Sequence, residues 1–261
     1  GCAVVIRNTV RRAQQTAREM REAFPDVEVR VAHASFLAAD RARIDGDLVR
    51  LFGPPDRAER PQRSIVVATQ VVEQSLDIDF DLMVTDLAPV DLVLQRIGRL
   101  HRHQRERPAP VAVPACYVAG ADWAEDPPKP DGGAVAVYGR WSLLASLAVL
   151  GEALDGAPVV LPRDIPGLVQ SAYADEVVLP VAWSDVGAAS RAKHLEQIAA
   201  RRTRANGMRI SAVGKRGRDL FDFSRAALGT IDEDDPRAQG YVRDGNDSIE
   251  VVVVQSEGGE D

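Results

Sequence analysis

The chain has 261 residues, of which 45% are hydrophobic, and a formal net charge of −7. This is enough sequence to bury a sizeable core in one or two domains, and the acidic balance argues against a purely electrostatic nucleic-acid binder. No apolar run reaches the roughly 18–20 residues of a membrane span and the start shows no signal-peptide features, so we expect a cytoplasmic protein.

Apolar strands alternate with amphipathic helices through the first 118 residues. We expect strands at residues 3–6, 27–31, 65–68, 82–85 and 111–118, with helices over 10–24 and 40–52. Asn8 or Thr9 can cap the first helix. Alternation of this kind is typical of a mostly parallel sheet with helices on both faces, so the predicted fold class is α/β.

Beyond residue 118 the pattern changes. Residues 119–133 predict a loop, residues 138–154 an apolar helix and residues 188–204 another helix. Ten basic residues between 191 and 225 indicate either a surface along single-stranded DNA or a solvated linker. Residues 241–254 predict a β-hairpin with four consecutive valines, as at the start of an unfinished C-terminal domain.

The stretch from 95 to 102, Q-R-I-G-R-L-H-R, sorts its residues onto two sides of one predicted helix. Gln95, Arg99 and Arg102 share one face, at spacings of four and three residues. Two guanidiniums and an amide aimed one way suit a polyphosphate, although a solvated arginine-rich face is the alternative. Gly98 sits inside this predicted helix, where glycine costs about 0.5–1 kcal/mol, which favours close approach of a neighbour or ligand.

Together with A-T-Q-V-V-E-Q-S-L-D at 68–77, this stretch resembles motifs V and VI of superfamily 2 helicases. More narrowly, the two runs resemble the helicase/nuclease of type I CRISPR interference, the CRISPR-associated protein three family. Residues 5–9 look like motif IV, and residues 33–41 and 161–173 look like further segments of that family. The resemblance implies a RecA-like second motor lobe at 1–120, a helical extension at 121–180, a basic linker at 181–235 and the start of a C-terminal domain at 236–261.

The resemblance also implies roles for individual residues. Arg99 and Arg102 would stabilise the transferring γ-phosphate, and Gln95 would sense nucleotide or water. The nucleotide-binding set would be Ser75, Asp77, Asp79 and Gly98. The DNA-binding set would be Asn8, Thr9, His33, Thr69, Gln70 and Glu73. A plain helix cap explains residues 8 and 9 equally well, and a lone histidine at a strand end is more often structural.

No Walker A lysine, acidic magnesium box or His/Asp nuclease cluster is found in this sequence. Asp77, Asp79 and Asp81 mimic the start of a calcium loop, but Leu82 and Ala88 replace its glycine and glutamate, so no metal site is predicted. We therefore expect a half-motor, inactive alone, whose ATP and Mg²⁺ are held mainly by a missing first lobe.

The expected partners are single-stranded DNA, the first lobe and nuclease domain of a parent chain, and a guide-RNA surveillance complex, with no membrane. Two alternatives stay open: a lobe of a generic superfamily 2 helicase, and a non-catalytic DNA- or protein-docking module. An unrelated Rossmann-like enzyme is disfavoured because residues 8–13 contain no glycine.

Overall fold

The computed structural model describes residues 1–73 and 76–207. The chain divides into two compact units, Gly1–His194 and Leu195–Asp261. Ser75, the basic residues beyond 207 and the predicted hairpin at 241–254 lie outside the described residues. Of the second unit the structure describes only residues 195–207, the last part of a long helix.

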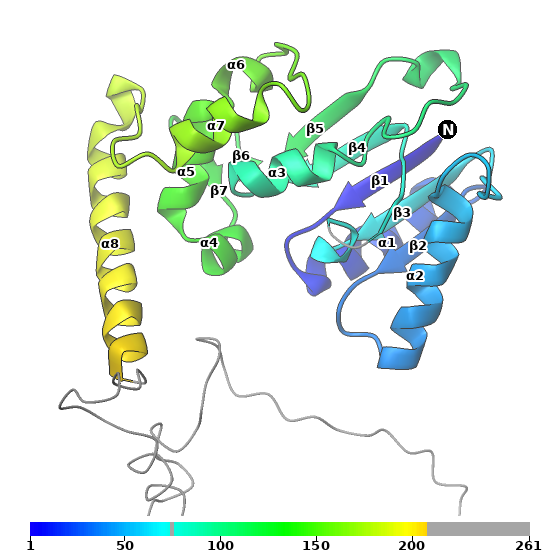
Figure 1. The fold of residues 1–261 in the computed structure, drawn as a ribbon, viewed down its shortest axis with the longest axis horizontal. Coiled ribbons are helices and arrows are strands. Elements are labelled where there is room, and N and C mark those ends of the chain that lie inside the picture. The colour runs from blue at the N-terminus through cyan, green and yellow to red at the C-terminus, as the bar shows by residue number, and fades with distance from the viewer. Residues whose placement is uncertain (74–75, 208–261) are drawn as a thin grey trace, which may run out of the picture. The chain divides into compact units, whose positions relative to one another are not determined.

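A five-stranded, wholly parallel sheet forms the centre of the first unit, in the order β2-β3-β1-β4-β5 (Figure 1). Its middle strand β1 aligns Val4 with Val66 of β3 and with Met83 of β4. The carboxyl ends of β3, β1 and β4 therefore lie side by side. The strands are β1 (Cys2–Ile6), β2 (Glu28–Ala32), β3 (Ser64–Ala68), β4 (Leu82–Asp86) and β5 (Ala115–Ala119).

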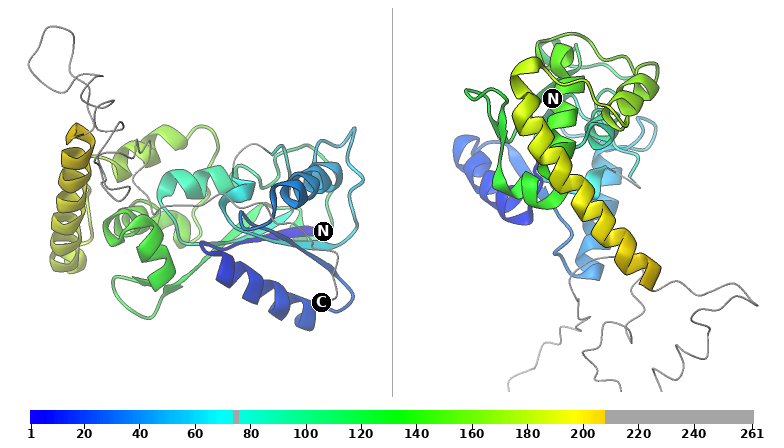
Figure 2. Two further views of the ribbon diagram at one scale, coloured as in Figure 1. Left: turned by 90° about the horizontal axis from the view of Figure 1, so that it is seen from below. Right: turned by 90° about the vertical axis from the view of Figure 1, so that its left-hand side faces the viewer.

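Helices cover both faces of this sheet, which confirms the predicted α/β class (Figure 2). Helix α1 (Val10–Ala23) packs Ala13 and Ala17 onto one face, and the Thr9 hydroxyl caps it by accepting from the Arg12 amide at 3.4 Å. Helices α2 (Ala38–Phe52) and α3 (Val90–Ile97) cover the opposite face. The capping interpretation of residue 9 is thus confirmed.

The prediction of one helix through residues 95–102 was wrong. Helix α3 ends at Ile97, and Gly98 is its C-cap, not an interior residue. The chain then turns, because Phe80 donates to the Arg99 carbonyl at 2.9 Å and accepts from the His101 amide at 3.0 Å. This strand-like pairing takes over the backbone groups that a longer helix would have used.

The predicted strand at 111–118 is also shorter than expected, since residues 109–111 form a 3₁₀ turn and β5 begins at Ala115. A small antiparallel pair, β6 (Ala121–Asp122) and β7 (Lys129–Pro130), follows it. Helix α7 (Ile165–Ala172) and helix α8 (Ser184–Gly207) complete the described elements of the C-terminal half. Helix α8 includes the predicted helix at 188–204.

The apolar helix predicted at 138–154 is broken into three pieces, so that prediction was wrong. They are α4 (Gly132–Tyr138), α5 (Arg140–Val149) and α6 (Gly151–Leu154). Gly139 adopts a φ of 78°, which glycine reaches without steric cost, and the axes of α4 and α5 differ by 101°. In the described part of the chain no single helix is long and apolar enough to span a membrane, although this bent pair passes that test together.

We expect Phe52→Ala to lower the free energy of unfolding by about 3–5 kcal/mol, because the Phe52 ring is fully buried and lies 5.2 Å from the ring of Phe80. Urea denaturation followed by circular dichroism would measure the loss. Val49→Ala on the same helix is the control, since Val49 is 38% exposed. Equal losses in the two variants would contradict the assignment of Phe52 to the core.

Candidate functional site

Several predicted site residues meet where β1, β3 and β4 end. Asn8 follows β1, Thr69 and Gln70 follow β3, and Asp86 closes β4. The Asn8 amide donates to the Asp86 carboxylate at 3.0 Å, and the Gln70 side-chain amide donates to the Asn8 carbonyl at 3.1 Å. The carboxyl ends of parallel strands are where α/β sheets bind ligands, so the fold places these residues at the expected edge.

A buried arginine, Arg96, holds this edge together. Its Nε and Nη2 atoms both lie 2.7 Å from Glu73 Oε1, and its side chain is 0% exposed. The same guanidinium donates to Thr85 Oγ1 at 2.7 Å, to the Asp86 carbonyl at 2.9 Å and to Asn8 Oδ1 at 3.2 Å. Burial raises the pKa of Glu73, and the charge of Arg96 opposes that shift.

The sequence analysis did not single out Arg96. The helical pattern gave no clear signal, because at 3.6 residues per turn Arg96 falls midway between Val93 on the apolar side and Arg99 on the polar side. Glu73 was predicted to bind DNA, yet it is 5% exposed and its carboxylate is taken by Arg96. The structure therefore places Glu73 beside the DNA-binding candidates, as the counter-ion of a buried arginine.

The other DNA-binding candidates differ in what they expose. Asn8 and Thr69 are 3% exposed, and Asn8 Nδ2 donates to the Leu87 carbonyl at 2.8 Å. Gln70 and Thr9 are partly exposed. His33, which follows β2, is 5% exposed and stacks on Phe36 with ring centroids 4.1 Å apart. Contacts between these residues and DNA stay predictions.

The two arginines predicted to act on phosphate lie in the turn after α3. Arg99 is half-buried and donates through Nη2 to the Glu73 carbonyl at 2.8 Å, and among the described residues its buried Nε has no hydrogen-bond partner. Desolvation and the nearby charge of Arg102 lower the pKa of Arg99. An unpaired donor beside a second guanidinium is an arrangement that an anion would complete.

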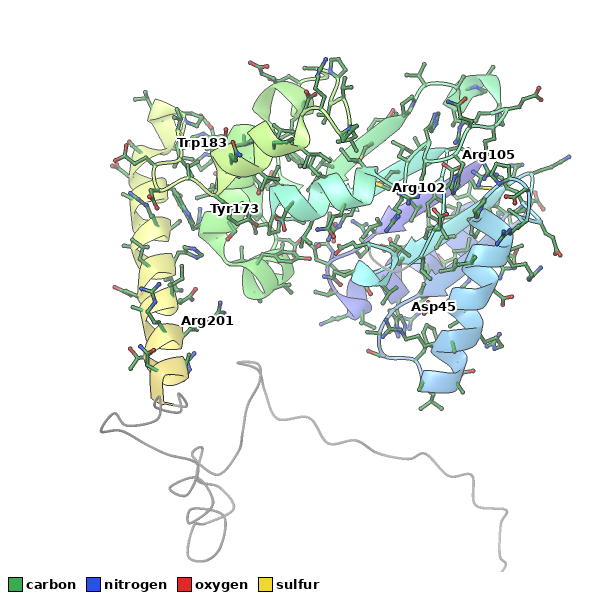
Figure 3. The ribbon with its side chains drawn as sticks, viewed as in Figure 1. Asp45, Arg102, Arg105, Tyr173, Trp183 and Arg201 are labelled. Carbon is green, nitrogen blue, oxygen red and sulfur yellow. The ribbon has the colours of Figure 1, made fainter. Side chains whose placement is uncertain are left out.

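Arg102, which is labelled in Figure 3, is exposed, whereas Arg99 is only partly exposed. Arg102 Nε donates to Asp77 Oδ1 at 2.6 Å, and His103 Nε2 lies 3.2 Å from the same carboxylate oxygen. The hydrogen bond from Arg102 lowers the pKa of Asp77. Asp77 thus binds the arginine that was predicted to face a phosphate, and Gln95 is exposed on the last turn of α3.

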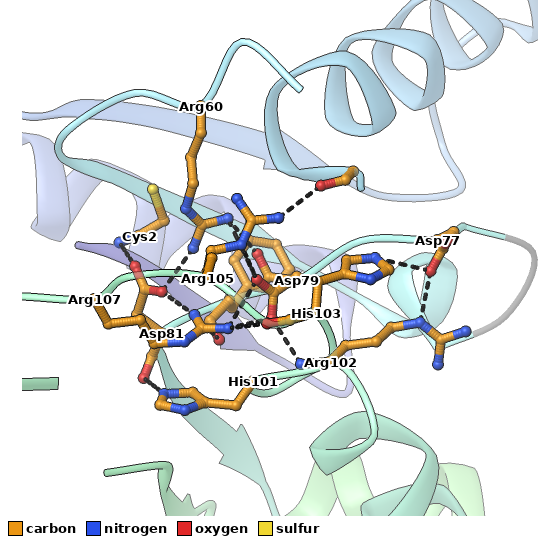
Figure 4. Close-up of polar contacts among 12 residues, drawn as sticks. Cys2, Arg60, Asp77, Asp79, Asp81, His101, Arg102, His103, Arg105 and Arg107 are labelled. Carbon is orange, nitrogen blue, oxygen red and sulfur yellow. Dashed lines mark hydrogen bonds and ion pairs between the residues drawn. The ribbon is translucent and has the colours of Figure 1, made fainter. Parts of the chain in front are cut away.

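Two further carboxylates anchor the loop that carries Arg102 (Figure 4). Asp79 is 0% exposed and accepts from the Arg102 backbone amide at 2.7 Å and from Arg107 Nη2 at 3.0 Å. Asp81 is 2% exposed and accepts from Arg60 at 2.8 Å and from the Cys2 amide at 2.6 Å. Burial acts to raise the pKa of Asp81, but these hydrogen bonds outweigh it and the pKa is lowered.

Asp79 was predicted to contact the nucleotide, but its carboxylate is enclosed by arginines of the protein itself. Arg105 Nε also lies 2.7 Å from Asp79 Oδ2. The sequence analysis missed the arginines of this cluster, although the acidic D-x-D-x-D run implied that cations must face it. A direct contact of Asp79 with nucleotide stays a prediction, as does one by Gly98, whose nearest non-neighbour atoms are the carbonyls of its own helix.

A basic pocket of about 430 Å³ opens beside this loop. Side chains with arginine or imidazole groups dominate its lining, so its electrostatics favour anions. It is lined by His101, Arg102, His103, Gln104, Arg105, Arg107 and Ala112. Within the described residues no group of three or more His, Cys, Asp and Glu side chains could hold a metal ion.

The family model and the curated relatives that match this chain all carry the same family name. Residues 1–105 match a family model described as CRISPR-associated nuclease/helicase Cas3, C-terminal. The chain is 35% identical to the CRISPR-associated nuclease/helicase Cas3 of Streptococcus thermophilus, over 98% of this chain and 27% of that protein. It is 38% identical to the Cas3 endonuclease/helicase of Thermus thermophilus, over 84% of this chain and 24% of that protein. The chain thus spans about a quarter of the curated relatives it matches.

Solved structures give the same result. A crystal structure of a CRISPR-associated protein superposes with a TM-score of 0.73 and 37% identity, over 83% of this chain and 24% of that chain. The crystal structure of T. fusca Cas3-ATP superposes with a TM-score of 0.71 and 33% identity, over 81% of this chain and 24% of that chain. A chain of a CRISPR RNA-guided surveillance complex in a pre-nicking state superposes with a TM-score of 0.67 and 32% identity. The match covers 80% of this chain and 25% of that chain.

Arg96→Met should lower the free energy of unfolding by about 3–5 kcal/mol, because it leaves the buried Glu73 carboxylate without its counter-ion. Adding Glu73→Gln should restore part of that loss, since a neutral amide costs less to bury. Chemical denaturation of the two single variants and the double variant would measure the coupling. Additive losses would show that the two side chains act independently.

The buried imidazole of His33 should make stability depend on pH. Desolvation lowers the pKa of His33 in the folded state, so the unfolded chain binds the proton more readily. The contribution is fully present above the unfolded pKa of about 6.5 and is lost as the pH falls towards the lower folded value. Unfolding free energies measured from pH 7.5 to 5 should fall less steeply in His33→Asn, and identical slopes would contradict this.

Proposed function

We propose that this chain, which belongs to the Cas3 family of CRISPR-associated nuclease/helicases and matches their C-terminal part, forms the second motor lobe of an ATP-dependent helicase and supplies its arginine fingers. The observation that carries the proposal is the pair Arg99 and Arg102. One has an unpaired buried Nε among the described residues, and the other is exposed and held by Asp77. In a two-lobed motor such arginines neutralise charge that develops on the transferring phosphoryl group.

The residues present fit a nucleotide whose phosphates approach from another lobe. ATP with Mg²⁺ would supply the phosphoryl group and the charge that this site meets. Arg99 would donate its free Nε, and Arg102 would exchange Asp77 for a phosphate oxygen, because both bonds are charge-assisted and similar in strength. Gln95 on the adjacent turn of α3 would sense nucleotide or water, and Asp77 would be left to contact the ribose. Solved relatives that carry ATP, ADP and AMPPNP in their names support a nucleotide-dependent parent protein.

The edge formed by β1 and β3 would contact the DNA backbone. Thr9 and Gln70 are partly exposed there, and backbone amides at the start of α1 are suited to a phosphate. His33 and Asn8 are buried, so they would hold the exposed residues of that edge in place. The motor lobe would occupy residues 1–120, followed by a helical extension at 121–180 and a basic linker at 181–235.

The chain would act as part of a longer protein, since its relatives are about four times as long. A first motor lobe would hold most of the ATP and Mg²⁺, a nuclease domain would cut the strand, and residues 236–261 would begin a further domain. The match to a chain in a surveillance-complex structure supports recruitment by such a complex. By itself this chain would hydrolyse no ATP.

In the longer enzyme, Arg102→Ala should lower single-stranded-DNA-stimulated ATP turnover by roughly 10³-fold or more, the scale of an arginine finger. Arg99→Ala should act in the same direction. Arg18→Ala is the matched control, because Arg18 is exposed on α1 away from the turn after α3. Phosphate release would be measured with the enzyme saturated in ATP.

A second arrangement tests the half-motor directly. This chain, mixed with a separately produced first lobe shown to associate with it, should gain turnover that depends on Arg102, whereas the chain alone should have none. Turnover by the chain alone, or full activity of Arg102→Ala in the longer enzyme, would contradict the proposal. The second result would favour a docking module that takes no part in hydrolysis.

A further inference from the structure

Tyr138 is the last residue of α4 and the only residue of the helical extension for which the structure records hydrogen bonds with Asn8, Gln70 and Arg96. Its phenol oxygen accepts from Gln70 Nε2 at 2.9 Å and from Arg96 Nη2 at 3.2 Å. The hydroxyl donates to Asn8 Oδ1 at 3.5 Å, a long contact. A tyrosine hydroxyl has one donor and two acceptor positions, so these contacts use its whole capacity.

The local fold explains why the phenol reaches this point. Asp131 caps α4 by accepting from the Ala134 amide at 3.0 Å, and it forms an ion pair with Arg12 of α1. At the other end Gly139, with its φ of 78°, turns the chain into α5. Helix α4 is therefore attached to the lobe at its start. The sharp bend after it keeps Tyr138 at the sheet edge while the leucines of α5 pack with Leu87.

The three partners of the phenol come from separate elements with different proposed tasks. Gln70 begins the 3₁₀ turn after β3 and belongs to the proposed DNA edge. Arg96 lies one residue before the end of α3 and shares Glu73 with the turn that carries Arg99. The phenol oxygen is thus a direct bridge between the DNA side and the nucleotide side of the lobe.

We propose that Tyr138 is a positioning residue that couples DNA binding at Gln70 to the placement of Arg99. This inference rests on the proposed function. A shift of Gln70 towards a DNA phosphate would change the bond it donates to the phenol, and the phenol would then keep only its bonds with Arg96 and Asn8. Arg96 transmits the change through Glu73. The Glu73 carboxylate accepts a hydrogen bond from Arg96, and the Glu73 carbonyl accepts one from Arg99.

The hydroxyl can be removed without removing the structure around it. Arg96 would keep Glu73, Thr85, the Asp86 carbonyl and Asn8 Oδ1, and Gln70 would keep the Asn8 carbonyl. What is lost is the link from Gln70 to Arg96 through the phenol. The ring would still pack against both neighbouring apolar clusters. Tyr138→Phe therefore deletes the bridge selectively, whereas Tyr138→Ala also deletes the packing.

The test uses the longer enzyme and measures ATP turnover with and without single-stranded DNA. For Tyr138→Phe we expect the ratio of stimulated to basal turnover to fall about three- to tenfold, the factor that one hydrogen bond is worth, with little change in melting temperature. Tyr173→Phe is the matched control, since it removes a hydroxyl of the same extension that donates to Asp91 at 2.6 Å. The control should keep the wild-type ratio.

The possible outcomes separate a failure of the Tyr138 coupling from a failure of the proposed function. A wild-type ratio in Tyr138→Phe, with Arg102→Ala inactive, overturns the coupling and leaves the proposed function intact. Equal losses of basal and stimulated turnover with a lowered melting temperature also overturn it, because they show a structural role only. Full activity of Arg102→Ala overturns the proposed function and this inference with it.

Discussion

The ion pair between Arg96 and Glu73 is the interaction on which the rest of this site depends. Two opposite charges are removed from water, which is unfavourable unless every donor and acceptor is satisfied. The protein meets that demand with Thr85 and the Asp86 carbonyl from β4 and with Asn8, which follows β1. Those strand ends can therefore occupy only one arrangement relative to α3, and the residues predicted to bind ligands are placed as a result.

A second set of charges fixes the turn after α3. Asp79 and Asp81 are buried and accept hydrogen bonds from two arginine side chains, Arg60 and Arg107, and from two backbone amides. Arg105 adds an ion pair with Asp79. This keeps Arg102 in the lining of the pocket, where it donates to Asp77. The buried Asp79 and Asp81 anchor the turn rigidly, whereas the ion pair between Arg102 and Asp77 is exposed and can be exchanged. Both properties suit a residue that has to meet a phosphate in a defined position.

The helical extension is more than packing in this arrangement. Leu143, Leu144 and Leu147 of α5 form an apolar cluster with Leu87, directly after β4. Because that cluster fixes the extension to the strand end, the Tyr138 phenol can complete the polar network around Arg96. The polar bridge therefore depends on the apolar contacts, and a glycine with positive φ makes both possible in one short segment.

The sequence by itself determined the first four strands, the first two helices, the α/β class and the stretches that would carry the site, because these follow from local hydrophobic periodicity and from residue order. It could not determine where α3 ends or where the helix at 138–154 breaks. Backbone pairing with Phe80 settles the first, and the conformation of Gly139 settles the second. Only the tertiary structure decided which charged residues are buried partners and which face solvent. Arg96, Arg60 and Arg107 look like any surface arginine until the fold brings Glu73, Asp79 and Asp81 against them.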